Sequence, residues 1–123
     1  MAVRAVRGAT QVDVDDKEHV LRRTRELLQE VLSANKIEHD DVISIVFSAT
    51  RDVSSVAPAV AARQLGLEEP ALFCLQEMYV EGSMPRVVRL MLHVETELAR
   101  ADVQNVYLRG TELLRADVPT FED

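Results

Sequence analysis

The chain has 123 residues and a mass of 13.8 kDa, with 47% hydrophobic and 28% charged residues, a size and composition that indicate one folded domain. Its net charge of −7 argues against nucleic acids and anionic membranes as partners, because both are bound by an excess of Lys and Arg. The one cysteine, Cys74, excludes an internal disulfide, and no Cys/His spacing indicates a metal or a cofactor site. Without a signal-peptide core or a membrane-spanning apolar run, we expect a cytoplasmic protein.

The first half of the chain predicts a strand, a long helix and a second strand. Residues 2–12 are strand-like and end in an acidic turn that can cap a helix. From Lys17 to Asn35 the apolar residues follow helical spacing with charged residues opposite, and we expect His19 on the outward face. Residues 42–49 are rich in β-branched residues, which predicts a strand buried on both faces.

The second half predicts a short helix and three more strands. Pro58 can begin a helix over about residues 58–66, and Gly66 can end it. The three strands are predicted at residues 71–80, 86–96 and Val106–Leu114, with a helix as the alternative at 86–96. We expect the tail from about residue 116 to be flexible. The order predicts an α+β domain, in which one long helix and a short helix accompany a mixed five-stranded sheet.

Three charged residues lie in segments that otherwise predict apolar core. Arg7 lies in the first predicted strand, Glu77 in the third and Arg89 in the fourth. A buried charge is costly unless it is paired or contacts a ligand. Glu77 and Arg89 could form a cross-strand salt bridge, but one carboxylate cannot neutralise two guanidiniums. The excess positive charge indicates a pocket for a small anion, and the planar fork of Arg suits a carboxylate.

Other polar residues have a structural interpretation beside a functional one. Cys74 with His93 could form a nucleophile and its base, but a lone cysteine is more often inert packing. Cys74 and Glu77 are three residues apart, so in a regular strand they point to opposite faces. Arg63 fits a solvated helix face. Tyr107 fits either the core, with its hydroxyl bonded, or a pocket wall, where it would be a donor.

Several segments together resemble the AroH-type chorismate mutases. They are Arg4–Thr10, Ser48–Asp52, Pro58 to Arg63, Cys74–Met78, Arg89 with Met91, Val106–Leu108 and Leu114 with Arg115. The resemblance runs nearly from end to end, in order and with similar spacing. It implies a homotrimer that looks like an α/β barrel, with three mixed sheets inside, helices outside and a site at each subunit interface. It also implies conversion of chorismate into prephenate, in phenylalanine and tyrosine biosynthesis, without a cofactor or a metal.

The resemblance also implies roles for individual residues. Arg89 is similar to the family's cation near the breaking ether oxygen, Arg7 to its carboxylate-binding arginine, and Glu77 to the acceptor for the ring hydroxyl. Further substrate-binding residues implied in this way are Cys74, Tyr107, Arg63, Phe73, Ala57, Ala59 and Leu114. The departures from some members are Ala57 in place of an aromatic residue, Phe73 in place of a small polar residue and Val60 in place of a lysine.

The chemistry implied by the resemblance agrees with the residues. A unimolecular rearrangement needs a folded substrate and stabilisation of charge on the departing oxygen, and it needs no nucleophile, acid or base. A pocket with two arginines and one glutamate meets that demand. Two alternatives remain open from the sequence: an imine-hydrolysing deaminase on a similar trimeric barrel, and a non-catalytic regulatory module that binds a small anion.

Overall fold

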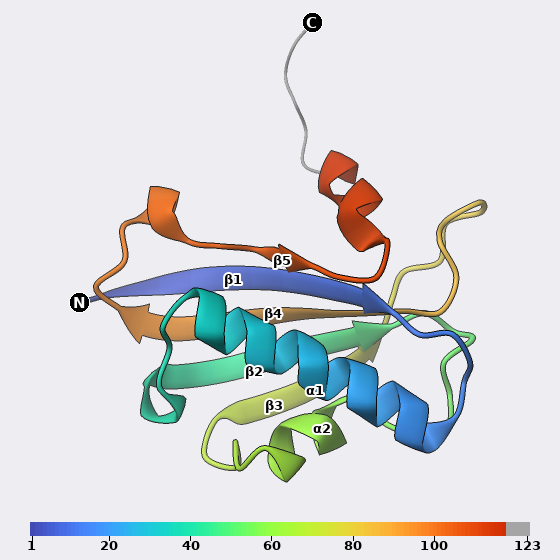
Figure 1. Ribbon diagram of the computed structural model, residues 1–123, viewed down its shortest axis with the longest axis horizontal. Coiled ribbons are helices and arrows are strands. Elements are labelled where there is room, and N and C mark those ends of the chain that lie inside the picture. Colours follow the sequence, from blue (N-terminus) through green and yellow to red (C-terminus); the bar gives the residue numbers. More distant parts are fainter. Residues whose placement is uncertain (118–123) are drawn as a thin grey trace, which may run out of the picture.

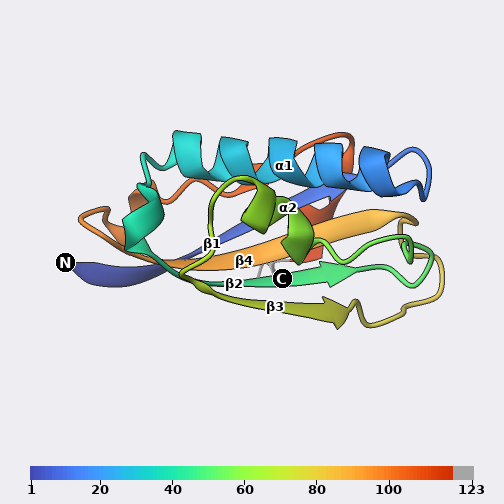
Figure 2. The same ribbon diagram turned by 90° about the horizontal axis from the view of Figure 1, so that it is seen from below.

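The computed structural model describes residues 1–117 and shows one mixed sheet with both α-helices on one face (Figures 1 and 2). The strands are β1 (Ala2–Gln11), β2 (Val42–Ala49), β3 (Ala71–Gln76), β4 (Val87–Thr96) and β5 (Val106–Tyr107), in the sheet order β3-β2-β4-β1-β5. The α-helices are α1 (Lys17–Ala34) and α2 (Ala59–Gln64), and short 3-10 helices are η1 (His39–Asp41), η2 (Arg100–Asp102) and η3 (Thr111–Asp117). The predicted α+β class with a mixed five-stranded sheet is confirmed, and so is the strand at 86–96.

Strand β4 organises the sheet. It pairs antiparallel with β1 along ten residues on one side and with β2 on the other. The two outer strands are added in parallel, β3 beside β2 and β5 beside β1. Figure 1 shows β3 at one edge of the sheet and β5 at the other. The strands that carry Arg7 and Arg89 are therefore neighbours at the centre of the sheet.

The core lies between the sheet and the two helices. Buried side chains of α1 pack against one face of β1, β2 and β4, with Leu27 and Val31 at the centre of the contact. A Cβ added at Gly8 would lie 3.1 Å from both of these side chains, so a glycine lets α1 approach β1 closely. In this chain only one face of β2 is covered, and the prediction of burial on both faces is wrong for the single chain. None of the helices in residues 1–117 has the length and apolarity needed to cross a bilayer.

Strand β3 is shorter than predicted. It ends at Gln76 rather than at residue 80, and Glu77 makes the last contact, donating its N–H to the carbonyl of Ala49 at 2.8 Å. The neighbouring strand β2 ends at Ala49: the N–H of Thr50 still donates to the carbonyl of Val87 on β4, but the N–H of Val87 donates to the Thr50 hydroxyl at 3.0 Å instead of to a backbone carbonyl. Residues after Glu77 thus have no strand to pair with, and an apolar sequence alone does not extend a strand.

The fifth strand is also shorter than the prediction of Val106–Leu114. It ends at Tyr107, because Arg109 and Gly110 both have positive φ, at 56° and 86°, and turn the chain into η3. The tail predicted to be flexible begins at about residue 116, and its first two residues, 116 and 117, are the end of η3; its flexibility stays a prediction. Residues 118–123 lie outside the described part of the chain.

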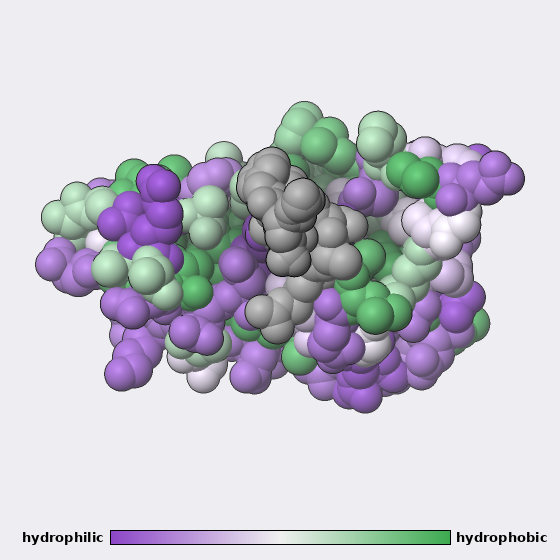
Figure 3. Space-filling view, turned by 90° about the horizontal axis from the view of Figure 1, so that it is seen from above, coloured by the Kyte–Doolittle hydropathy of each residue, from purple (hydrophilic) through white to green (hydrophobic). Residues whose placement is uncertain are grey.

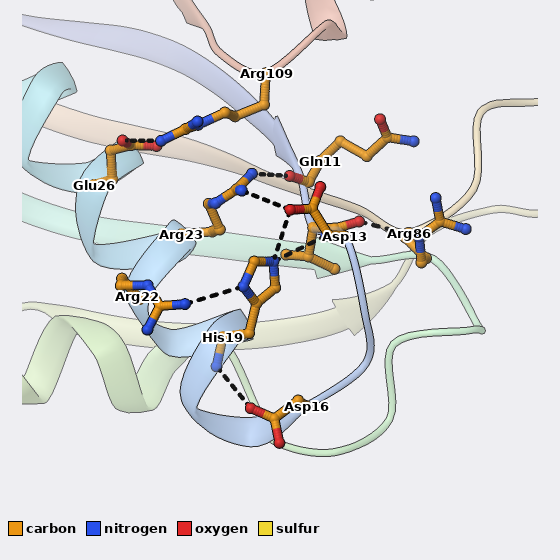
Figure 4. Close-up of polar contacts among 10 residues, drawn as sticks. Gln11, Asp13, Asp16, His19, Arg22, Arg23, Glu26, Arg86 and Arg109 are labelled. Atoms are coloured by element: carbon orange, nitrogen blue, oxygen red, sulfur yellow. Dashed lines mark hydrogen bonds and ion pairs between the residues drawn. The ribbon is translucent and has the colours of Figure 1, made fainter.

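A buried histidine fixes the start of α1, and the prediction that His19 points outward is wrong (Figure 4). Asp16 caps the helix by accepting the N–H of His19 at 3.1 Å. The ring Nε2 of His19 accepts a hydrogen bond from the backbone N–H of Asp13 at 2.9 Å. The Asp13 carboxylate in turn accepts a hydrogen bond from the Arg23 guanidinium at 2.8 Å. Side chains in the first helical turn point back toward the incoming chain, which explains the inward position of His19.

Arg109 ties the turn after β5 to α1. Its guanidinium donates two hydrogen bonds to the Glu26 carboxylate, at 3.1 and 2.7 Å (Figure 4). These bonds lower the pKa of the Glu26 carboxyl below its ordinary value. The contact holds the chain that follows Tyr107 against the helix layer, and so it helps to place Tyr107 at the edge of the sheet.

Candidate active site

The candidate site lies on the face of the sheet that α1 and α2 leave uncovered. Side chains alternate between the two faces of a strand, and those of Val6 and Leu90 are in the helix-covered core, so Arg7 and Arg89 point to the other face. Arg89 is the register partner of Ala9 on β1 and of Ser48 on β2. Arg7 is therefore a diagonal neighbour of Arg89, within reach of a long side chain.

Glu77 joins this face at the point where β3 ends. One carboxylate oxygen, Oε1, accepts the hydroxyl of Ser48 at 2.5 Å. The other, Oε2, lies 3.6 Å from Nη1 of Arg89, and the Glu77 and Arg89 side chains are 29% and 25% exposed. The structure thus confirms that Glu77 and Arg89 come together, across the strand β2 that lies between their own strands.

Two cavities meet at Arg89. The first, of about 250 Å³, is lined by Arg7, Gly8, Val46, Ser48, Arg89, Leu90, Met91 and Tyr107. The second, of about 420 Å³, is lined by Thr50, Glu77, Met78, Val80, Ser83, Met84, Val87, Arg89 and Leu114. Five of the predicted site residues therefore border a region made of these two adjoining cavities. Among the described residues that line it, Glu77 is the one acidic side chain beside two arginines, so the region has a positive balance that suits an anion.

The remaining predicted site residues lie elsewhere in the single chain. Phe73 and Cys74 are exposed on the edge strand β3, and Ala57 and Arg63 are exposed before and on α2, which packs near that edge. Ala59 is buried against the core. None of these five lines the two cavities at Arg89. The predicted residues thus form two groups, one around Arg89 and one at the β3 and α2 edge.

Cys74 lies on the opposite side of β3 from Glu77, as the three-residue spacing predicts. Its register partner on β2 is Phe47, which is buried under the helices, whereas the next residue pair, Ser48 and Leu75, is on the uncovered face. His93 contacts Ser44, with 3.1 Å between Nδ1 and the hydroxyl oxygen, and it lies on β4, two strands away from β3. The thiol and this imidazole are therefore not a nucleophile and base pair.

We predict that Cys74→Ser keeps most of the activity. His93, the base considered from sequence, does not lie beside the thiol. A hydroxyl of similar size preserves any contact that the sulfur makes with a ligand. Steady-state turnover of the variant should stay close to that of the parent. Complete loss of turnover in a folded Ser variant would instead assign the thiol a chemical step.

Ser48 is a site residue that the sequence analysis missed. It lines the first cavity and holds Glu77 by a hydrogen bond. The available signal was weak: Ser44 and Ser48 interrupt an apolar strand four residues apart and so lie on one face. A serine in a strand usually needs no ligand to explain it, and only the structure shows that this one meets a charged residue from another strand.

A metal site was not expected from sequence. Within residues 1–117, no three His, Cys, Asp or Glu side chains gather where they could share a metal ion. The absence of a metal requirement remains a prediction.

Comparison with known proteins agrees with the geometry. The family model for chorismate mutase type I matches residues 3–118. The chain is 36% identical to chorismate mutase AroH of Bacillus subtilis (strain 168) over 119 residues, covering 96% of this chain and 94% of that protein. It is 39% identical to chorismate mutase AroH of Thermus thermophilus over 121 residues, covering 98% and 99%. A solved structure of a chorismate mutase from Clostridium thermocellum superposes with a TM-score of 0.87 at 39% identity, covering 89% of this chain and 97% of that one.

Proposed function

The chain belongs to the type I chorismate mutases of the AroH type, isomerases that convert chorismate into prephenate in aromatic amino acid biosynthesis, and we propose that it does so in the pocket around Arg89, Arg7 and Glu77. The observation that supports this pocket is the presence of two arginines and one carboxylate around two adjoining cavities. Chorismate carries two carboxylates, so one net positive charge in the pocket and the fork geometry of arginine complement it.

The reaction breaks the ether C–O bond and forms a C–C bond in one cyclic step. Negative charge grows on the ether oxygen as its bond to the ring lengthens. In this proposal Arg89 points its guanidinium at that oxygen from a position that is 25% exposed, where a fixed donor is worth more than in open water. Because no covalent intermediate forms, the enzyme needs to hold the folded conformer and to stabilise this charge.

The other residues of the pocket position the substrate. Arg7, on the strand β1 that neighbours β4, binds a carboxylate of the substrate. Tyr107, on the edge strand β5, adds a hydroxyl donor. Glu77 accepts the ring hydroxyl. Leu114, in η3, closes the cavity that contains Glu77. Each of these contacts fixes the substrate before the bond breaks, which is where positioning lowers the barrier.

We propose a homotrimer in which the second group of residues completes the site. The uncovered sheet face exposes large apolar side chains, among them Phe73 at 61% and Leu75 at 49% exposure. Figure 3 shows hydrophobic surface along the upper margin of the molecule, the side away from α1. A monomer gains stability by burying such a surface against copies of itself. The β3 and α2 edge of one subunit would then bring the exposed residues Phe73, Ala57 and Arg63 to the Arg89 pocket of the next, while Ala59 supports that edge from the core.

We predict three chains in solution at micromolar concentration, and dissociation by Leu75→Glu. A charge on the face that packs against the neighbour would be buried without a partner, so the trimer should weaken and activity should fall with it. Val14→Glu is the matched control, because Val14 is exposed in the loop before α1, away from the sheet. Native mass spectrometry measures the state directly. A stable and fully active monomer would contradict the shared site.

We also propose a cytoplasmic location. The product of the family is an intermediate of amino acid biosynthesis, which favours a location inside the cell. The free, exposed thiol of Cys74 also suits a reducing compartment. Fractionation of cells that produce the protein would test this location.

Loss of chorismate absorbance in the presence of the purified chain tests the function, and prephenate should appear in equal amount. Binding of prephenate without turnover would instead favour a non-catalytic module. Hydrolysis of an imine substrate would favour a deaminase. The family match and the relatives favour neither of these alternatives.

A further inference from the structure

We propose that Ser48 is a positioning residue that keeps Glu77 from closing onto Arg89, an inference that rests on the proposed function of this pocket. Ser48 is half-buried on the uncovered face of β2, and its register partner on β4 is Arg89 itself. Its hydroxyl donates to Oε1 of Glu77 at 2.5 Å. Ser48 is therefore adjacent to Arg89 and, at the same time, forms a hydrogen bond with the Glu77 carboxylate that faces Arg89.

The geometry of the ion pair carries the inference. An arginine and a carboxylate that are free to move settle into two parallel hydrogen bonds of about 2.8 Å. Here Oε2 of Glu77 is 3.6 Å from Nη1 of Arg89, and Oε1 is occupied by Ser48. The backbone of Glu77 is held as well, by the bond from its N–H to Ala49 at 2.8 Å. With one oxygen bonded to Ser48 and the backbone fixed, the carboxylate is restrained at this distance from the guanidinium.

This restraint has a consequence for the reaction. A tight, two-point pair with Glu77 would turn the donors of Arg89 away from the ether oxygen and offset its charge at the moment when negative charge develops there. A carboxylate held at a distance still accepts the ring hydroxyl but competes less for the donors of Arg89. Ser48 thus acts through Glu77 on the transition-state contact of Arg89, and its effect should fall on kcat more than on KM.

The test compares Ser48→Ala, Ser48→Thr and the control Ser44→Ala. Ser44 lies on the same strand and the same face, but it contacts His93 instead of Glu77. We expect Ser48→Ala to lower kcat by about tenfold or more, the size of a lost hydrogen bond to a charged group. Ser48→Thr retains the hydroxyl on a residue that strands favour and should recover most of kcat. Ser44→Ala should behave as the parent.

A double-mutant cycle separates positioning from a general loss of structure. In a Glu77→Gln background the neutral amide no longer attracts Arg89 as a carboxylate does, so adding Ser48→Ala should change kcat by less than about threefold. An equal loss in both backgrounds would overturn the inference, and so would a Ser48→Ala variant with the kcat of the parent. A parent that fails to consume chorismate would instead overturn the proposed function, which the Ser48 series presupposes.

Discussion

Arg89→Ala should lower kcat by at least about 10²–10³, the range for removing one preorganised donor from a developing oxyanion. In the proposed site, the guanidinium interacts more strongly with the negative charge that grows on the ether oxygen than with the neutral ether of the bound substrate. Only such a differential interaction accelerates the chemical step. Because the neighbouring Glu77 would then be without its cation, the loss of Arg89 also leaves a partly buried carboxylate that repels the substrate.

Arg89→Lys distinguishes charge from geometry. Lysine keeps the positive charge but loses the planar fork, so this variant should also be impaired, although less than Arg89→Ala. Arg22→Ala is a suitable control, since Arg22 lies on α1, in the helix layer that covers the opposite face of the sheet. Turnover is measured by loss of chorismate absorbance, and the fold by circular dichroism and native mass. An Arg89→Ala variant whose kcat stays within about threefold of the parent would make Arg89 a structural residue and refute the site.

The long elements of the fold could be predicted because their patterns are continuous. The helical spacing of apolar residues places α1, and runs of β-branched residues place β2 and β4. The two elements predicted too long, β3 and β5, are those whose ends depend on other parts of the chain. Strand β3 stops where β2 stops, and β5 stops where Arg109 adopts a positive φ that no sequence pattern requires of arginine.

Some residues of the candidate site could likewise be predicted from the sequence, and others could not. Arg7 and Arg89 could be found from sequence because a charge in an apolar strand is conspicuous, and strand alternation leaves both on one face. Ser48 could not, since a small hydroxyl is unremarkable in a strand and its value comes from Glu77, 29 residues along the chain. The separate group at the β3 and α2 edge was implied by the resemblance to the family, and its joining the Arg89 pocket depends on the proposed trimer.

The second large effect is expected for Arg7→Ala, which should raise KM by about 10- to 100-fold while kcat changes little. A hydrogen bond to a charged group contributes about 1.5–3 kcal/mol, and about 1.4 kcal/mol corresponds to a tenfold change in binding. The substrate carboxylate that Arg7 is proposed to bind keeps its charge throughout the rearrangement. The contact therefore stabilises the ground state and the transition state alike, and its loss appears in KM.

The fold should tolerate this change, which makes the measurement clean. Strand β1 is held by its full ladder with β4, and the backbone N–H of Arg7 donates to the side chain of Asn105 at 2.8 Å, so neither restraint involves the guanidinium. Arg7→Lys keeps a point charge and should recover part of the affinity. Steady-state kinetics over a wide range of chorismate concentration separate the two constants. A fall in kcat with KM unchanged would contradict the assignment, because it would place Arg7 at the oxygen where charge develops, the position proposed for Arg89.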